Sequence, residues 1–136
     1  MVKSQFSISL HIMALLALYP EEWLSSKIIA SSLNINAVLV RKEIAVLKSG
    51  DLIESKEGKN GGVRLHKSAK KIYLSDIFKL VKGKDNVLSF SSNEPNPACR
   101  VGKKINKNLT SIMNTIDSSI INELKKQTLE EFKNKF

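Results

Sequence analysis

Apolar residues return at helical spacing near the start of the chain and predict a first helix over residues 4–19. Five of them share one face: Ile8, Ile12, Leu15, Leu16 and Tyr19. They fall at the intervals that place side chains on one side of an α-helix. Ser4 is placed to cap this helix, and Pro20 closes it.

Two further helices are predicted, separated by a short turn. Ser25 or Ser26 caps the first, which ends at the turn Asn34-Ile35-Asn36, because Asn tolerates left-handed backbone and caps helices. The second spans residues 37–49 and stops at Gly50. Its inward stripe is Ala37, Val40, Ile44 and Leu47, and its outward face carries Val38, Arg41, Lys42, Ala45 and Lys48.

A glycine-rich turn lies between two short apolar segments, which is typical of a β-hairpin. The strands are expected over residues 52–56 and 63–66, with the turn Gly58-Lys59-Asn60-Gly61-Gly62 between them. Trp23-Leu24-Ser25 adds a brief extended piece, and a fourth helix is expected over residues 74–83. The predicted fold class is therefore mainly α with a small β-hairpin.

The remainder of the chain differs in character. Residues 84–99 contain two of the three prolines with several Ser and Asn, and we expect a loop there. From Val101 onward a long helix is expected, with an apolar stripe that Phe132 extends: Ile105, Leu109, Ile112, Ile116, Ile120 and Leu124. The stripe could pack back along one monomer, but it is too long for its own small domain to cover, which favours a dimer-forming helix. We therefore predict one domain over residues 1–83 and a second region, loop and dimerisation helix, over 84–136.

The composition of the 136-residue chain is that of an ordinary globular protein, with 42% hydrophobic and 26% charged residues. A single cysteine, Cys99, excludes an intramolecular disulfide framework and any metal site that needs several thiolates from one chain. The most apolar stretch, residues 10–19, is half the ~20 residues that a membrane-spanning helix needs, and no secretory signal is evident. We expect a cytoplasmic protein without a membrane partner.

Positive charge is concentrated in one segment. The chain has 22 Lys and Arg against 13 Asp and Glu, a net charge of +9, and residues 56–71 hold six basic residues and one acidic residue. A basic surface binds nucleic acid by releasing counterions from phosphates, although a Lys-rich surface can also serve only solubility. The order helix, turn, helix and hairpin favours nucleic acid. It is typical of a winged helix-turn-helix, whose second helix enters the major groove of DNA while the hairpin tip reaches adjacent phosphates or the minor groove.

Basic and polar residues occupy the elements that would touch duplex DNA in this arrangement. The expected contacts are Val38, Arg41 and Lys42 with base edges, Asn36 and Ser26 with the backbone, Lys59, Asn60 and Arg64 from the hairpin, and Lys3 and Ser4 from the first helix. Both basic elements thus lie where the docking would place them.

A series of short motifs carries a resemblance to a known family. The most distinctive is Gly58-Lys59-Asn60-Gly61-Gly62-Val63-Arg64-Leu65, a glycine pair before an aliphatic strand. The others are Ile29-Ala30, Leu33-Asn34-Ile35, Val40-Arg41-Lys42, Gly50-Asp51-Leu52-Ile53-Glu54-Ser55, Leu74-Ser75-Asp76-Ile77 and Val81-Lys82-Gly83. Together they resemble the small bacterial winged-helix regulators of the IscR, NsrR and CymR type. The resemblance implies a homodimeric transcription regulator, usually a repressor, that binds a near-palindromic operator.

The number of cysteines in the loop before the long helix differs from that in some members of the family. The resemblance implies that some members hold an iron–sulfur cluster on three cysteines before the long helix, whereas this loop has Cys99 alone. Because such a cluster needs about four ligands, mostly thiolate, we expect neither a cluster nor another cofactor. Cys99 is either a small buried apolar residue or a redox sensor whose pKa the helix start and Arg100, Lys103 and Lys104 would lower. Oxidation would give a sulfenic acid, a mixed disulfide or a Cys99–Cys99 bond across a dimer axis.

Two alternatives stand beside a DNA-binding regulator. One is a winged-helix protein-interaction module whose lysines confer only solubility. The other is a regulator that binds a small effector in the dimer cavity, with Cys99 structural. The sequence offers no nucleophile motif, phosphate-binding loop or paired catalytic carboxylates, and His11 and His66 lack a cluster of partner ligands. We therefore expect neither an enzyme nor a metal site.

Overall fold

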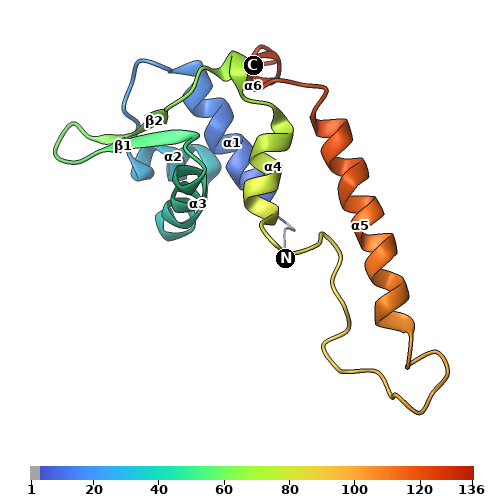
Figure 1. Ribbon diagram of the computed structural model, residues 1–136. Coiled ribbons are helices and arrows are strands. Elements are labelled where there is room, and N and C mark those ends of the chain that lie inside the picture. The colour runs from blue at the N-terminus through green and yellow to red at the C-terminus, as the bar shows by residue number, and fades with distance from the viewer. Residues whose placement is uncertain (1–3) are drawn as a thin grey trace.

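The computed structural model describes residues 4–136, which form a helical head with a hairpin on one side and a long helix on the other (Figure 1). In chain order the elements are α1 (Gln5–Leu18), α2 (Ser26–Leu33), α3 (Ala37–Ser49), β1 (Ile53–Lys56), β2 (Gly62–Leu65), η1 (Ala69–Lys71), α4 (Leu74–Lys82), α5 (Ile105–Leu124) and α6 (Leu129–Lys133). The predicted fold class, mainly helical with one antiparallel hairpin and a long helix towards the end of the chain, is confirmed.

Side-chain caps fix where the two consecutive helices α2 and α3 begin. The Ser25 hydroxyl accepts a hydrogen bond of 3.2 Å from the Ile28 amide at the start of α2. Asn36 Oδ1 accepts one of 2.8 Å from the Val38 amide at the start of α3, and Asn34 between the helices is left-handed with φ 55°. These caps were predicted. The predicted Ser4 cap is wrong, because Ser4 precedes α1 but its side chain makes no capping hydrogen bond.

Gly62 allows the hairpin to lie against the chain segment before α2. Strands β1 and β2 pair antiparallel, with Ile53 opposite Leu65. The predicted extended piece at Leu24 adds a bridge to Val63, with amide–carbonyl distances of 2.8 and 2.9 Å. Gly62 has φ +150°, and a Cβ there would collide with the Leu24 carbonyl. Only glycine at position 62 therefore lets the segment around Leu24 approach β2 so closely.

The core of the head includes a residue from the last helix. Its fully buried apolar side chains are Ile12, Met13, Leu16, Ile29, Val40, Leu47, Ile72, Ile77 and Leu129. Leu129 belongs to α6, which packs against α1 and η1, and its amide donates a 2.7 Å hydrogen bond to the Ile72 carbonyl. The domain boundary after residue 83 stays a prediction, but one continuous core draws on both sides of it.

The long helix is shorter at both ends than predicted. α5 begins at Ile105 rather than Val101, because residues 99–104 form successive turns. It ends at Leu124, and Thr128 then starts α6 with a capping box. Phe132 therefore lies on a separate helix, and the expectation that it extends the α5 stripe is wrong. No helix within residues 4–136 is long and apolar enough to cross a membrane.

A buried carboxylate attaches the long loop to α5. Asp117 is only 4% exposed and accepts hydrogen bonds from Asn86 Nδ2 (2.6 Å) and the Val87 amide (3.2 Å). Lys82 Nζ at the end of α4 lies 3.6 Å from the same side chain. These contacts hold the beginning of the loop against α5, and the rest of the loop lies at the end of α5 away from the head (Figure 1).

Candidate nucleic-acid interface

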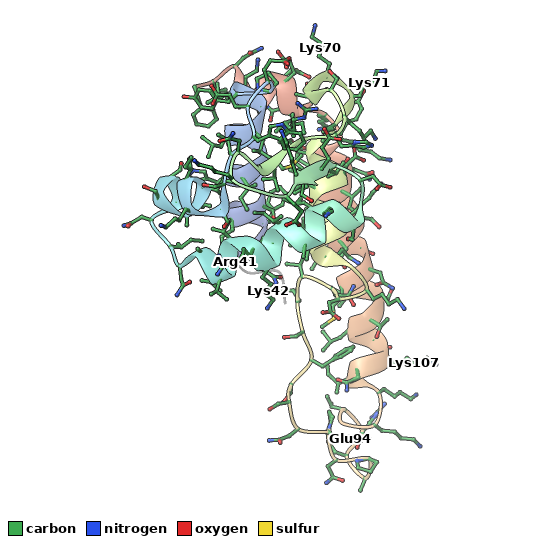
Figure 2. All side chains as sticks on the ribbon, turned by 90° about the vertical axis from the view of Figure 1, so that its left-hand side faces the viewer. Arg41, Lys42, Lys70, Lys71, Glu94 and Lys107 are labelled. Carbon is green, nitrogen blue, oxygen red and sulfur yellow. The ribbon has the colours of Figure 1, made fainter. Side chains whose placement is uncertain are left out.

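Helix α3 presents a polar and basic face because its apolar stripe is buried in the head. Val40 and Leu47 are fully buried. All five residues predicted to face outward are exposed: Val38, Arg41, Lys42, Ala45 and Lys48. Val38 is 60% exposed, and Arg41 and Lys42 project from the same side of α3 in Figure 2. The helix thus offers a surface of the kind that reads base edges in a major groove.

The start of α2 lies beside this surface. Arg41 Nη1 is 3.5 Å from the Ser26 hydroxyl, so two of the predicted DNA contacts meet in the structure. Asn36, also predicted to contact DNA, uses its side-chain oxygen to cap α3. The beginnings of α2 and α3 therefore lie together, as they do where a helix-turn-helix approaches a phosphate backbone.

The hairpin separates an exposed tip from an anchored base. Lys59 and Asn60 are exposed in the loop between the strands. Arg64 differs: its Nε donates a 2.8 Å hydrogen bond to Glu54 Oε1, and its guanidinium carbon lies 4.1 Å from the centroid of the Trp23 ring. The tip is free to meet a polyanion, whereas Arg64 holds the two strands and Trp23 together.

The Glu54 side chain on β1 binds two residues at the anchored end of the hairpin. Its Oε2 lies 3.0 Å from His66 Nδ1, in addition to the bond from Arg64 to Oε1. The hydrogen bond from Arg64, followed by that from His66, lowers the pKa of Glu54 below its ordinary value of 4.5. The carboxylate therefore stays ionised beside the basic hairpin at neutral pH.

The basic segment 56–71 divides between the hairpin, on one side of the head, and η1 (Figure 1). Lys56 and Lys59 lie on the hairpin and its loop, whereas Lys70 and Lys71 lie on η1, at the end of the head opposite Arg41 and Lys42 (Figure 2). Only part of the charge concentrated in the sequence thus lies beside α3. Among the predicted contacts from the first helix, Ser4 is exposed and Lys3 lies outside the described residues.

Two residues that shape this region, Trp23 and Glu43, were not predicted to take part in the site. The Trp23 ring packs against the Arg64 guanidinium. An aromatic residue shortly before a basic hairpin was the sequence signal that could have indicated this contact. Glu43 is 4% exposed on the inner side of α3. Its position, three residues after Val40 and four before Leu47, continues the buried stripe and could have revealed it.

Cys99 lies exposed in a turn of the long loop. Its amide donates a 3.1 Å hydrogen bond to the Asn96 carbonyl. Hydrogen bonds from the backbone of Gly102 and Val101 lower the pKa of the thiol below its ordinary value of 9.0. The direction agrees with the sequence prediction, but the cause is the backbone rather than neighbouring cations, and Cys99 precedes α5 by several residues.

Within residues 4–136 the donor atoms are not arranged as the ligands of a thiolate-bound iron–sulfur cluster. Residues 4–136 contain no group of three or more His, Cys, Asp or Glu side chains placed to hold a metal ion. Cys99 is the one cysteine in the sequence. A cluster bound mainly by thiolates would lack its ligands on this loop.

Known proteins of similar sequence and structure are transcriptional regulators. YwnA of Bacillus subtilis, named as an HTH-type transcriptional regulator, is 34% identical over 134 residues, which are 98% of each protein. A protein from Lactobacillus plantarum, titled a transcriptional regulator, superposes with a TM-score of 0.79 at 22% identity, covering 97% of this chain and 89% of that one. CymR, the global cysteine regulator of B. subtilis, superposes with a TM-score of 0.71 at 23% identity, covering 98% and 95%.

The family assignment rests on similarity that extends over nearly the whole chain. The two structural neighbours support the fold, and YwnA supports the relationship in sequence. The sequence profile of the Rrf2 family, described as an iron-dependent transcriptional regulator, matches residues 2–135. The resemblance inferred from the motifs is thereby confirmed, and the chain belongs to the Rrf2 family of transcriptional regulators.

Proposed function

We propose that this Rrf2-family regulator is a homodimer that represses transcription by binding a near-palindromic operator. The observation that carries the proposal is the common exposure of Val38, Arg41 and Lys42 on α3, with the hairpin tip free beside the head. In this arrangement α3 enters the major groove and the tip reaches adjacent phosphates or the minor groove.

The proposed contacts follow the positions of the side chains. Arg41, Lys42 and Val38 approach base edges, with Ser26 beside Arg41. Asn36 brings the beginning of α3 to the backbone. From the hairpin, Lys59 and Asn60 contact DNA directly, whereas Arg64 serves chiefly to hold the hairpin in place. Ser4 and Lys3 are proposed phosphate contacts beside the first helix.

Exposed apolar side chains on the second region support a dimer. Ile112 on α5 is 55% exposed, and Leu88 and Val101 on the preceding loop are 50% and 66% exposed. Apolar side chains left exposed on one monomer are the kind of surface that a protein interface covers. Pairing of two α5 stripes would present two α3 helices to half-sites separated by about one turn of DNA. Ile112→Glu should convert the dimer into monomers in sedimentation equilibrium, while Ile28→Glu on the exposed side of α2 should not.

Cys99 is the proposed sensor of an oxidant, and no bound cofactor is proposed. Its thiolate would attack a peroxide, forming an S–O bond and releasing hydroxide, to give a sulfenic acid. The thiol of the partner's Cys99 could then form the S–S bond with loss of water. The lowered pKa and the exposure of Cys99 support this step. A regulator governed by a small effector, with Cys99 unreactive, is the second candidate.

Selection of random duplex DNA by the purified reduced protein tests the proposal. Half of the protein is first treated with mild peroxide, and Cys99→Ser is treated in parallel. We expect a two-fold symmetric motif that wild-type protein loses on oxidation and Cys99→Ser retains. A motif that survives oxidation in the wild type would remove the sensor and keep the regulator. Failure of the reduced protein to enrich any sequence would favour the protein-interaction module instead.

A further inference from the structure

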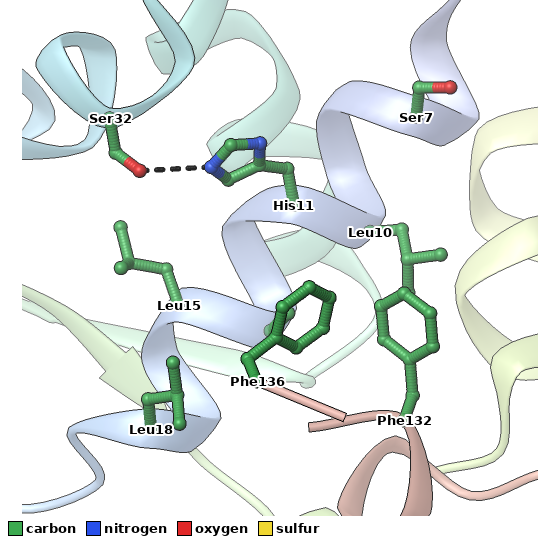
Figure 3. A pocket seen from close by; sticks show the side chains of 9 residues that line it. Ser7, Leu10, His11, Leu15, Leu18, Ser32, Phe132 and Phe136 are labelled. Atoms are coloured by element: carbon green, nitrogen blue, oxygen red, sulfur yellow. Dashed lines mark hydrogen bonds between the residues drawn. The ribbon is translucent and has the colours of Figure 1, made fainter. Parts of the chain in front are cut away.

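A pocket of about 430 Å³ lies between α1, α2 and the end of the described chain (Figure 3). Its walls come from three parts of the sequence: Leu15 and Leu18 from α1, Ser32 from α2, and Phe132 and Phe136 from α6 and the residues after it. This volume falls in the range of ligand pockets, about 300–1,000 Å³. The pocket is on the head but apart from the α3 surface and from Cys99.

Most of the pocket lining is apolar and remains open to solvent. Phe132 and Phe136 meet edge to face, with ring centroids 5.3 Å apart. Phe136 is nevertheless 74% exposed and Leu18 is 40% exposed. Covering such side chains with a ligand is favourable because apolar area leaves water. The two rings and the leucines suit a flat or branched apolar body.

One end of the pocket is polar. His11 Nε2 on α1 lies 2.9 Å from the Ser32 hydroxyl on α2, as the dashed line in Figure 3 marks. Among the side chains that line the pocket, His11 is the ionisable one, and none is acidic. When His11 Nε2–H donates to the Ser32 oxygen, the hydroxyl proton of Ser32 is left to donate a hydrogen bond to an anionic oxygen. The whole chain carries a net charge of +9, which also favours an anion.

We propose that this pocket binds a small organic acid with an aromatic or branched apolar body. The carboxylate takes a hydrogen bond from the Ser32 hydroxyl, which His11 Nε2 orients, and the apolar body lies against Leu15, Phe132 and Phe136. Such a ligand would join α2, the first helix of the DNA-binding pair, to the segment that follows the long helix. It is a different place from an effector site between two copies.

Binding is tested without DNA, using 4-phenylbutyrate as the probe and isothermal titration calorimetry or NMR as the readout. We expect saturable binding with a Kd of about 0.1–1 mM, reasonable for a ligand of this size. The neutral analogue 4-phenylbutanol should bind about three- to tenfold more weakly, because it lacks the charge-assisted hydrogen bond. Equal binding of acid and alcohol would overturn the assignment of the polar end.

Two pairs of variants locate the binding. Ser32→Trp fills the pocket and should weaken 4-phenylbutyrate binding by at least about tenfold, whereas Ser31→Trp, on the neighbouring exposed position outside the pocket, should not. Phe136→Ala should weaken binding about three- to tenfold, whereas Phe90→Ala on the distant loop should leave it unchanged. Circular dichroism confirms that each variant is folded. No saturation up to about 10 mM, or unchanged binding by both pocket variants, would overturn the proposal.

A consequence for DNA binding rests on the proposed function and is measured separately. If the ligand joins α2 to the last segment, saturating 4-phenylbutyrate should change operator affinity at least about threefold in the wild type and leave Ser32→Trp unaffected. Failure of the ligand-free protein to bind DNA would overturn the proposed function and leave the calorimetric result standing. Ligand binding without any change in operator affinity would overturn only the coupling.

Discussion

Ser9 on α1 donates a hydrogen bond of 3.2 Å to the carboxylate of Glu43 on α3, inside the head. Both side chains are buried, and Gln5 Nε2 lies 3.5 Å from the other carboxylate oxygen. The bond attaches the inner side of α3 to the first helix. Because the attachment fixes the buried side of α3, it helps to set the rotation of this helix about its own axis. Arg41 and Lys42, on the opposite side, therefore point outward.

Glu43→Ala should lower the free energy of unfolding by about 1–3 kcal/mol, because Ser9 would keep a buried hydroxyl without its acceptor. Urea unfolding followed by circular dichroism measures the change. Lys42→Ala, on the exposed side of the same helix, is the control and should stay within about 0.5 kcal/mol of the wild type. Ser9→Ala combined with Glu43→Ala should cost less than the sum of the two single changes. Strict additivity would show that the bond contributes nothing.

Arg41→Ala should relax the sequence preference of DNA binding. If Arg41 pairs with a guanine, the loss is about 1–3 kcal/mol at that base pair and little elsewhere. The measurement compares affinities for the selected operator and for single-base variants of it. An unchanged preferred sequence would mean that α3 docks in another register.

Lys59→Ala should weaken binding to every duplex by a similar factor. A phosphate contact carries no sequence information, so the slope of log affinity against log salt should also fall by about 1. Titrations at several salt concentrations measure both effects. Lys70→Ala, at the opposite end of the head, is the matched control and should change neither. An equal loss in both variants would place the DNA on a different face.

The Glu54 carboxylate should make stability depend on pH at the acidic end. Its pKa in the folded protein lies below the ordinary 4.5, so it stabilises the fold fully above that value and loses its contribution as the pH falls through the folded pKa. Glu54→Gln should therefore show a shallower fall in the free energy of unfolding between pH values just above 4.5 and those below it. Identical curves for the two proteins would show that Arg64 and His66 do not favour the ionised form.

Cys99 should react as a thiolate at lower pH in the folded protein than after unfolding. The backbone amides that lower its pKa are positioned by the turn, and denaturant removes them. Alkylation by iodoacetamide across a pH series should give a midpoint below 9.0 in the folded protein and a higher one in denaturant. Cys99→Ser should show no reaction. Coincident midpoints would remove the support that the turn gives to a sensor.

The DNA-binding part of the fold was predictable because its signals are local. The caps at Ser25 and Asn36, the stop at Gly50 and the glycine pair of the hairpin each act within a few residues. The outward residues of α3 followed from its apolar stripe alone. Sequence could not show that Arg64 would be engaged by Glu54 and Trp23, since that contact depends on how distant segments meet.

The second region was harder to predict for a related reason. The spacing of apolar residues shows that a helix has an apolar face. It does not show which tertiary contact will end the helix. Thr128 forms a bridge with Tyr73, and this tertiary contact separates α6 from α5. The turns around Cys99 also depend on Asn96, whose side chain accepts a 2.9 Å hydrogen bond from the Ala98 amide. Neither follows from the spacing of apolar residues.

The place of Leu129 in the core has a consequence during synthesis of the protein. A ribosome completes the segments from α1 to α4 well before residue 129, yet these segments lack one fully buried side chain until α6 arrives. Contacts between residues so far apart in sequence form late in folding. An unfinished chain therefore lacks one of the apolar side chains that pack in the core beside α1. The packing of the head around α1 is therefore completed only once α6 has been made.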